Sequence, residues 1–324
     1  MTLPNPPSMS LIAITTGPYA ILRRLIAHLR AQTIHDRLEL VIAAPTRSEL
    51  GLEESELAEF HSFKIVETGA CLSNPAARAA AIRAAGASFV ALTEEHSFPE
   101  PGWAEALLAA HDEGHSVVGP AILNANPLTL LSWANLLSEY GQWMERPKND
   151  QIEHLPGHNS SYRREVLLEY GDDLEDKLEA ESVIHWELRR RGLRLCLEPQ
   201  ARTRHLNVSR WSTTLRLRLS GGRNFAGSRA RVWGIGRRLL YTAASPLIPF
   251  VRFRRVLRDL RRIRARQPVP RGVGIVLLGI LMVDGLGEWM GYAFGTGDSV
   301  HVLTDLEFDR LDHMRHGDRE TLDR

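Results

Sequence analysis

The sequence predicts an α/β fold in which a mostly parallel β-sheet is flanked by helices and followed by a helical, membrane-associated appendage. Two observations predict the first part. Short apolar runs of buried-strand type recur up to residue 197, and segments with apolar residues at i, i+3 and i+4 stand between them. Such alternation is typical of a parallel sheet covered on both faces. A third observation, an Arg-rich helical pattern beyond residue 205, predicts the appendage. A chain of 324 residues is long enough for both parts.

The expected elements follow from these runs in chain order. Strands are expected at 9–15, 38–43, 63–66, 88–92, 116–119 and 193–197. Helices are expected at 20–31, 53–59, 74–85, 102–112, 128–137, 161–168 and 179–191, with a polar loop at 145–157. Turn residues separate several of them: Pro45 stops the second strand, Gly86 ends the third helix, and Gly192 suits the end of the last helix.

Cysteine content and the N-terminal sequence indicate the compartment. Only Cys71 and Cys196 occur, which argues against a disulfide scaffold or a Cys-rich zinc site and fits a reducing cytosol. The first residues lack the basic patch and apolar core of a signal peptide. We therefore expect the chain to begin in the cytoplasm and to stay there.

Charge is strongly segregated along the chain. The formal net charge is +1, yet residues 201–271 contain nineteen Arg, no Lys and a single acid, Asp259. This segment carries +18 and the remainder −17. Such segregation indicates an acidic body and a basic appendage that seeks a polyanion, either anionic lipid headgroups or nucleic acid.

The most informative motif lies in residues 91–103 (ALTEEHSFPEPGW), where Glu94, Glu95 and His96 follow the apolar run 88–92. The carboxyl edge of an open α/β sheet is where ligands bind. Glu94 and His96 point to the same side if strand geometry persists, so both can reach one divalent cation. A Glu oxygen with a His nitrogen suits Mn²⁺ and tolerates Mg²⁺ less well. The alternative is a solvated strand-to-loop turn.

Several segments together resemble a known family. An Ala/Arg-rich helix and an acid-ended strand precede Pro-Gly-Trp at 101–103; then come residues 157–167 (GHNSSYRREVL) and 186–195 (WELRRRGLRL). In this order they resemble a family 2 glycosyltransferase of the GT-A fold, from about residue 8 to residue 205. The resemblance implies a nucleotide-sugar donor and a transfer reaction that inverts the anomeric centre.

The resemblance also implies roles for individual residues. Residues 94–96 fall on the family's Asp-x-Asp motif, which binds metal and diphosphate; both ends are changed here, to Glu94 and His96. Glu181 falls on the Asp of the Glu-Asp motif that acts as general base, and Ala180 replaces the preceding acid. His205, after the last strand, is the candidate third metal ligand. The alternatives are a Glu181 that stabilises a helix N-terminus and a structural His205.

Donor and acceptor residues are assigned by position within the resemblance. The acid that relatives often carry after the second strand is missing, so the nucleobase is not predicted. Arg78 is a candidate for the diphosphate, and the alternative is a solvated helical arginine. Trp103 is a candidate acceptor contact, and the alternative is that it packs as the first apolar residue of its helix. The candidate donor-binding residues are Thr15, Thr16, Gly17, Ala43, Arg78 and Glu95, and the candidate acceptor residues are Trp103, His158 and Asn159.

The expected chemistry needs groups on two walls of one cleft. Charge builds on the leaving phosphate, where a metal, Arg or Lys neutralises it. A carboxylate on the opposite face removes the proton of the acceptor hydroxyl, a contribution of about 10²–10⁴-fold. Glu94 with His96 and Glu181 come from distant parts of the chain, as opposite walls require.

The basic appendage has the pattern of a membrane anchor. An apolar stretch at 239–251 precedes 252–264, where apolar residues recur at helical spacing among Arg, as in an interfacial amphipathic helix. A further apolar run, 272–283, is broken by Asp284 and then Glu288. Neither run reaches the ~18–20 uninterrupted apolar residues of a membrane span. We expect monotopic or peripheral attachment to the cytoplasmic face of a bacterial-type cell membrane and an acceptor that is lipid-linked or membrane-proximal.

The expected organisation is a catalytic domain at 1–205, the membrane-associated region at 206–297 and a charged tail at 298–324. Two other functional classes stay open. The changed Asp-x-Asp and Glu-Asp positions fit a degenerate relative that binds a nucleotide or glycan without turnover. Nucleic-acid binding through the Arg-rich segment is the less favoured of the two, because its Arg residues alternate with large aliphatics and Pro, and no nucleic-acid partner is expected.

Overall fold

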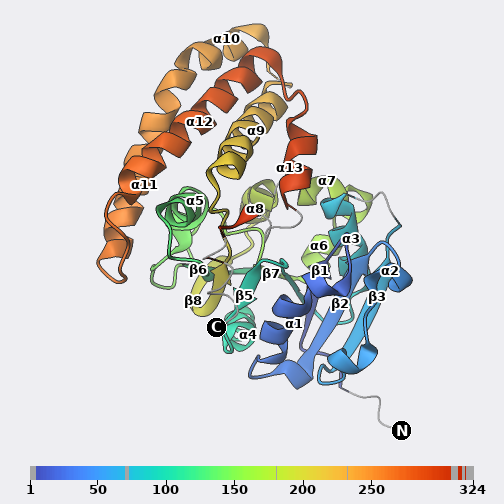
Figure 1. Cartoon of the computed structure of the whole chain (residues 1–324). Helices are drawn as coiled ribbons and strands as arrows, with labels where there is room; N and C mark the ends of the chain where they lie inside the picture. Colours follow the sequence, from blue (N-terminus) through green and yellow to red (C-terminus); the bar gives the residue numbers. More distant parts are fainter. Residues whose placement is uncertain are drawn as a thin grey trace. The chain divides into compact units, whose positions relative to one another are not determined.

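The computed structural model describes residues 5–69, 73–179, 181–231, 233–307, 313–315 and 318. The chain forms two compact units (Figure 1). The first comprises residues 1–123 with 145–204, and the second comprises 124–144 with 205–324.

The first unit is built on a sheet whose described strands have the order β3-β2-β1-β4-β7-β6-β8-β5. β1 pairs in parallel with β2 and β4, and β2 with β3, whereas the short β7 is antiparallel to both β4 and β6. The strands are β1 (Met9–Ile14), β2 (Leu38–Ala44), β3 (Ser62–Glu67), β4 (Phe89–Leu92), β5 (Ser97–Pro99), β6 (Val117–Asn124), β7 (Ser161–Arg163) and β8 (Leu195–His205).

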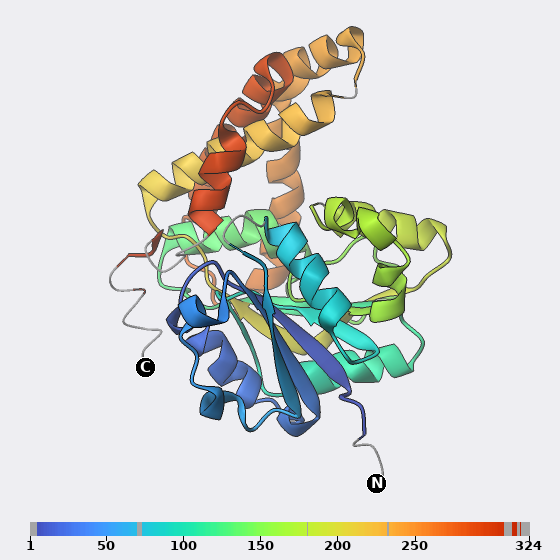
Figure 2. The same cartoon turned by 90° about the vertical axis from the view of Figure 1, so that its right-hand side faces the viewer.

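Helices cover both faces of the parallel strands, and α1 and α3 are seen on opposite sides of them in Figure 2. Alternate residues of β1, among them Met9 and Leu11, belong to one core with Leu25 of α1 and Trp103 of α4. α3 packs against β1, β2 and β3 on the other side. The helices are α1 (Arg23–Arg30), α2 (Arg47–Leu50), α3 (Asn74–Ala84), α4 (Trp103–Asp112), α6 (Arg164–Leu168), α7 (Leu174–Leu178) and α8 (Glu181–Arg190). The predicted α/β fold class is confirmed.

Local sequence explains where these helices begin and end. The Ser73 hydroxyl accepts the Ala76 N–H at 3.3 Å and caps α3, and Thr46 caps α2 by accepting the Glu49 N–H at 3.1 Å. Gly192, with φ 82°, follows α8 in the left-handed region that favours glycine.

Several sequence predictions differ from the structure. The helix expected over 161–168 begins only at Arg164, because residues 161–163 form β7 between β4 and β6. A three-residue buried strand is too short to show a period of two. β6 and β8 extend well beyond the predicted 116–119 and 193–197, and β5 was not predicted.

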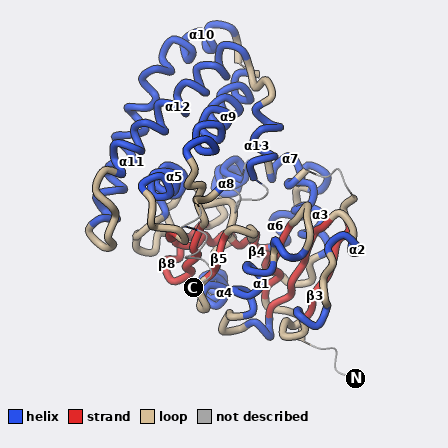
Figure 3. Tube along the Cα trace, viewed as in Figure 1, coloured by secondary structure: helices blue, strands red, loops and turns tan. Residues whose placement is uncertain are grey.

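The second unit is helical throughout its described elements (Figure 3), which are α5 (Leu130–Tyr140), α9 (Trp211–Ala230), α10 (Ile235–Ala244), α11 (Ile248–Arg264), α12 (Val273–Phe294) and α13 (Ser299–Glu307). Glycines let α9 and α12 approach closely. A Cβ at Gly287 would lie 2.2 Å from the Leu219 carbonyl oxygen, and one at Gly222 would lie 2.2 Å from that of Asp284. Small residues spaced in this way let two helix backbones come into contact.

Some Arg residues of the basic segment are neutralised inside this unit. The buried Arg218 guanidinium lies 2.8 Å from Glu139 and donates to Asn135 at 2.8 Å. Arg252 lies 3.4 Å from Asp284 and 3.1 Å from Glu288. Asp284 and Glu288, the acids that end the apolar run 272–283, are therefore ion-pair partners, and α12 continues through them.

α12 is the one helix among the described residues whose length and composition would allow it to cross a membrane; it has 22 residues, and 44% of its most apolar window is buried within the protein. The apolar stripe predicted for 252–264 has a different environment from the expected one. Val256, Leu260 and Ile263 are buried, and α11 packs against α12 and α5. The prediction that this stripe is an interfacial surface is wrong, because neighbouring helices cover it.

Candidate functional site

Glu94 and His96 meet through a tight turn at the end of β4. The strand ends at Leu92, and the Ser97 N–H donates to the Glu94 carbonyl at 3.0 Å. This turn brings His96 Nε2 to 3.6 Å from Glu94 Oε2. The two side chains are thus brought together as predicted, but by a turn and not by continued strand geometry.

The Glu94 carboxylate is also in contact with the segment before β7. His158 Nδ1 lies 3.3 Å from Oε1, and the Asn159 amide donates to Oε2 at 3.3 Å and to Ser97 Oγ at 3.0 Å. Glu94 is only 4% exposed, so the alternative of a solvated turn is wrong. Two residues assigned by position to the acceptor side therefore lie against the predicted metal ligand.

Backbone pairing places His158 and Asn159 there. The Asn159 N–H donates to the Leu92 carbonyl at 2.7 Å, and the Leu92 N–H donates to that of Ser160 at 3.0 Å. Asn159 has φ 69°, a left-handed conformation that asparagine tolerates better than most residues. The antiparallel β7 is therefore the element that delivers these side chains to the end of β4.

The donor set around Glu94 fits a divalent cation. His96 Nδ1 lies 2.9 Å from Glu95 Oε1, an arrangement in which a carboxylate orients an imidazole whose other nitrogen faces Glu94. The buried Asn159 Oδ1 has no hydrogen-bond partner within the described part of the chain. One carboxylate, imidazole nitrogens and an amide oxygen are ligands suited to Mn²⁺ or a similar ion. Glu95, predicted to contact the donor, here holds the His96 ring.

His205 is the last residue of β8 and is grouped with the second unit. There its Nδ1 lies 3.0 Å from Asn207 Oδ1, and its ring stands 4.6 Å from that of Tyr140, centroid to centroid. Its role as third metal ligand stays a prediction.

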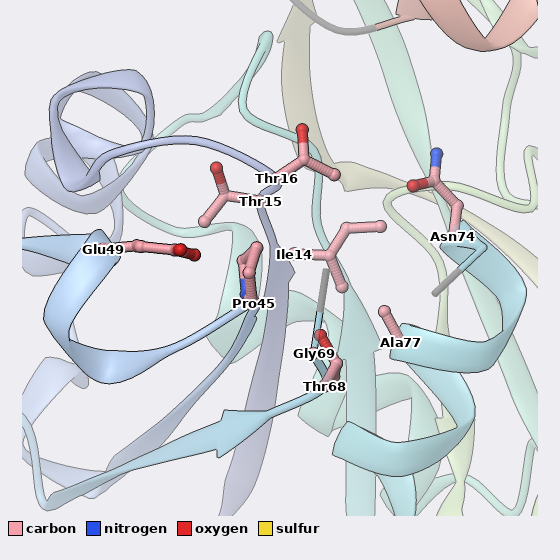
Figure 4. A pocket seen from close by; sticks show the side chains of 9 residues that line it. All are labelled: Ile14, Thr15, Thr16, Pro45, Glu49, Thr68, Gly69, Asn74 and Ala77. Atoms are coloured by element: carbon pink, nitrogen blue, oxygen red, sulfur yellow. The ribbon is translucent and has the colours of Figure 1, made fainter. Parts of the chain in front are cut away.

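A cavity of about 310 Å³ lies at the carboxyl ends of β1, β2 and β3 (Figure 4), within the usual size range of small-molecule sites. Thr15 and Thr16, both predicted donor-binding residues, line it. Glu49 of α2 also lines it and was not predicted. It places a carboxylate close to the end of β2, where residues 43–45 contain no acid. The lining residues are Ile14, Thr15, Thr16, Pro45, Glu49, Thr68, Gly69, Asn74 and Ala77.

Other predicted donor residues stand beside this cavity without lining it. The Gly17 N–H donates to Thr15 Oγ1 at 3.1 Å, and the Ala43 carbonyl accepts the Thr15 N–H at 3.0 Å. Arg78 follows the lining residue Ala77 in α3 and is 5% exposed. The alternative of a solvated Arg78 is therefore wrong.

Trp103 begins α4 and is fully buried in the core with Leu107 and residues of β1 and β2. This environment agrees with the alternative that it packs as the first apolar residue of its helix.

Glu181 is the first residue of α8; its side chain and Ala180 lie outside the described residues. The helix that begins at Glu181 is fixed to β7 by the Tyr162 hydroxyl, 3.0 Å from His185 Nε2. The Leu155 N–H donates to His185 Nδ1 at 3.3 Å. α8 and the loop that carries His158 are therefore anchored through the same histidine.

Comparison with known proteins identifies the protein family to which the chain belongs. The family model described as glycosyl transferase family 2 matches residues 10–171, which is half of the chain. The chain belongs to glycosyl transferase family 2. A comparison with curated proteins finds no match.

Two solved structures show a distant likeness. A crystal structure of GalNAc-T7 with UDP, GalNAc and Mn²⁺ is 14% identical, with a TM-score of 0.45, and the match covers 63% of this chain and 44% of that one. The chain thus spans less than half the length of that protein. The mannosyltransferase PcManGT from Pyrobaculum calidifontis, in complex with GDP-Man and Mn²⁺, is 14% identical with a TM-score of 0.49, over 98% of this chain and 83% of that one. The family assignment rests on the family model.

Proposed function

We propose that this glycosyltransferase moves a sugar from a nucleotide-sugar donor to a lipid-linked or membrane-proximal acceptor hydroxyl, with inversion at the anomeric carbon. The observation that carries the proposal is the buried Glu94 carboxylate, held among His96, His158 and Asn159 at the end of β4. β4 is parallel to β1, so this group and the cavity at Thr15 and Thr16 stand at the same edge of the sheet.

The cavity is the proposed nucleoside site. Its hydroxyl, amide and backbone groups suit a ribose and a base, and Glu49 offers a carboxylate acceptor for ring or ribose donors. Arg78, buried one residue beyond Ala77, is the proposed cationic partner of the diphosphate. Such a charge stabilises the phosphate that leaves in the transition state.

Glu94 and His96 are the proposed protein ligands of a divalent cation, Mn²⁺ or Mg²⁺, with His205 as the third ligand and Glu95 as the residue that orients His96. When bound, the cation supplies positive charge to the diphosphate. The protein's own contribution is to hold the acidic and imidazole groups in place before the donor arrives, and the hydrogen bonds of Asn159 to Glu94 and Ser97 support this.

Glu181 is the proposed general base. It occupies the first position of α8, one helical turn before His185, which is bonded to β7 and to the loop ahead of His158. In the reaction its carboxylate accepts the acceptor hydroxyl proton as that oxygen attacks the anomeric carbon. The bond to the leaving diphosphate breaks in the same step.

The second unit is the proposed membrane attachment. Several of its exposed large apolar side chains lie on α10, on the turn that follows it and at the start of α11, and we name this set the apolar edge: Ile235, Leu239, Leu240, Leu247, Phe250 and Val251. Arg254, Arg255 and Arg258 follow on α11 and are exposed. Apolar insertion together with a basic patch gives the two signals that stable membrane binding needs.

A panel of nucleotide sugars tests the catalytic proposal. The full-length protein is incubated with each donor, and release of the nucleoside diphosphate is measured with Mn²⁺, with Mg²⁺ and with chelator. We expect one donor to be turned over in a metal-dependent manner. A protein that binds nucleotide sugars but releases nothing under any condition, even with membrane lipid extract as acceptor, is instead the degenerate binder.

A further inference from the structure

We propose that His115, Asp150 and Cys196 form a second metal site, selective for Zn²⁺, which is separate from the donor site. The three residues come from distant parts of the first unit. One ligand atom of each lies within 4.8 Å of the other two, and His115 Nε2 is 3.2 Å from Asp150 Oδ1.

The fold fixes the three segments that carry these residues. The Ser116 N–H donates to the Arg194 carbonyl at 2.8 Å, so the residues before β6 are paired with the start of β8. Asn149 and Leu197 exchange backbone hydrogen bonds of 3.2 and 3.0 Å, so the loop that carries Asp150 is paired with the same strand. The cluster therefore follows from main-chain pairing and does not rely on long surface side chains.

The site lies at the opposite edge of the sheet from Glu94. β7 is antiparallel to both β4 and β6, so β4 and β6 run in the same direction. Glu94 follows the end of β4, whereas His115 precedes the first residue of β6. A metal bound here would not take part in the chemistry of the donor.

The histidine is oriented as metal-binding histidines are. His115 Nδ1 lies 2.7 Å from the Ala110 carbonyl, and because a carbonyl only accepts, Nδ1 carries the proton. Nε2 then presents its lone pair toward Asp150, and such a backbone contact is the usual support for a ligating imidazole. His115 and Cys196 are fully buried, while the Asp150 side chain is 42% exposed and gives a path for metal entry.

The chemistry of the ligands selects the metal. A thiolate with an imidazole and a carboxylate suits Zn²⁺, whereas Mg²⁺ and Ca²⁺ prefer oxygen ligands alone. Three protein ligands leave the fourth tetrahedral position to water. On binding, the Cys196 Sγ–H bond is broken, the proton passes to solvent and the sulfur electron pair forms the bond to the metal.

Arg194 is the competitor for this position. Its guanidinium lies 3.1 Å from His115 Nε2 and 3.5 Å from Asp150 Oδ2, and it also donates to the Glu113 carbonyl at 3.1 Å. A bound cation would displace this group, and the Arg194 side chain, 53% exposed, has room to move into solvent. Lys148 stands nearby but is paired with Glu113 and Glu198.

Cobalt binding to the full-length protein tests the proposal, because a thiolate bound to Co²⁺ gives a near-ultraviolet charge-transfer band that oxygen and nitrogen ligands do not. We expect one equivalent of Co²⁺ to produce this band, Zn²⁺ to abolish it by displacement, and Mg²⁺ to leave it unchanged. The Cys71→Ser protein is the matched control and should keep the band. Cys196→Ser should lose it, and Arg194→Gln should bind Co²⁺ severalfold more tightly.

The result that overturns the proposal is a wild-type protein without the band, or a band that persists in Cys196→Ser. Because Cys196 is buried and its substitution can impair folding, Asp150→Asn gives a second test at a half-exposed position. This variant should keep the fold, as judged by circular dichroism, and bind Co²⁺ more weakly. Unchanged Co²⁺ affinity in Asp150→Asn means that the cluster is an ordinary charge network closed by Arg194.

Discussion

Asn159 donates its side-chain amide to Glu94 at 3.3 Å from a left-handed backbone conformation with φ 69°. One residue thus serves two purposes: its backbone turns the chain into β7, and its side chain holds the carboxylate at the end of β4. A glycine would allow the backbone conformation without the hydrogen bond, and an alanine would allow neither. This difference makes the two roles separable.

We expect Asn159→Gly and Asn159→Ala to weaken donor binding to a similar degree, because both remove the amide that holds Glu94. Asn159→Ala should lower the free energy of unfolding by about 1–2 kcal/mol more than Asn159→Gly does, since alanine must adopt the left-handed conformation with a Cβ. Calorimetric titration with donor and urea unfolding measure the two effects. Wild-type donor affinity in Asn159→Gly would show that the amide has no role in the site.

For the proposed base, Glu181→Gln keeps the size of the side chain and removes its basicity. Sugar transfer should fall by about 10²–10⁴-fold while the donor dissociation constant changes little. Glu179→Gln, which changes an exposed carboxylate two residues earlier, is the matched control and should transfer at the wild-type rate. Near-normal turnover by Glu181→Gln would assign the base to another residue.

For the proposed cation site, we expect chelator to lower donor affinity and Mn²⁺ to restore it. In the Glu94→Ala/His96→Ala protein, donor affinity should be low and insensitive to chelator, because the ligands themselves are gone. Isothermal titration of both proteins, with and without chelator, measures this. If chelator leaves the wild-type affinity unchanged and the double variant still binds donor, these residues do not bind a metal.

The local patterns predict the fold better than they predict the site. Strands β1 to β4 and helices α1, α3 and α4 follow from apolar periodicity, which nearby residues determine. β7 was missed because its three residues are strand only between β4 and β6. The pattern of α11 shows an apolar stripe but not what covers it, and here Val256 and Ile263 are covered by neighbouring helices.

The same difference between local pattern and long-range contact explains which residues of the site could be predicted. Glu94, His96 and Asn159 lie in motifs short enough to be noticed in the sequence. Glu49 reaches the cavity only because α2 turns back over the end of β2, and nothing in its local sequence marks it as a ligand. His115, Asp150 and Cys196 are brought together by strand pairing across the chain, which spacing alone does not reveal.

His111 gives a prediction about pH. Burial lowers the pKa of this histidine from 6.5 to about 4, and its neutral ring lies 2.9 Å from the His115 carbonyl and 2.8 Å from Ser161 Oγ. As the pH falls, the unfolded chain takes up this proton before the folded protein does. The free energy of unfolding is therefore unaffected by His111 above pH 6.5 and falls progressively between pH 6.5 and 4. The total loss amounts to about 3 kcal/mol. Urea unfolding between pH 7 and 4 should show this loss, and His111→Gln should be less stable at pH 7 but show a shallower decline. Parallel curves for the two proteins would contradict the assignment.

The membrane proposal makes the apolar edge of α10 and α11 the part that inserts. Each fully buried Leu or Phe side chain there contributes about 1.5–3 kcal/mol, and each Arg near an anionic surface adds up to about 1 kcal/mol. Full-length protein should therefore float with liposomes that contain anionic lipid, and less protein should float as salt rises. Leu239→Asp/Phe250→Asp should abolish flotation, because it places charge among the inserting residues. Leu128→Asp, which changes an exposed leucine of the second unit outside the apolar edge, should float like the wild type. A full-length protein that ignores anionic liposomes at low salt, or a double variant that still floats, would mean that α10 and α11 do not attach this enzyme to a membrane.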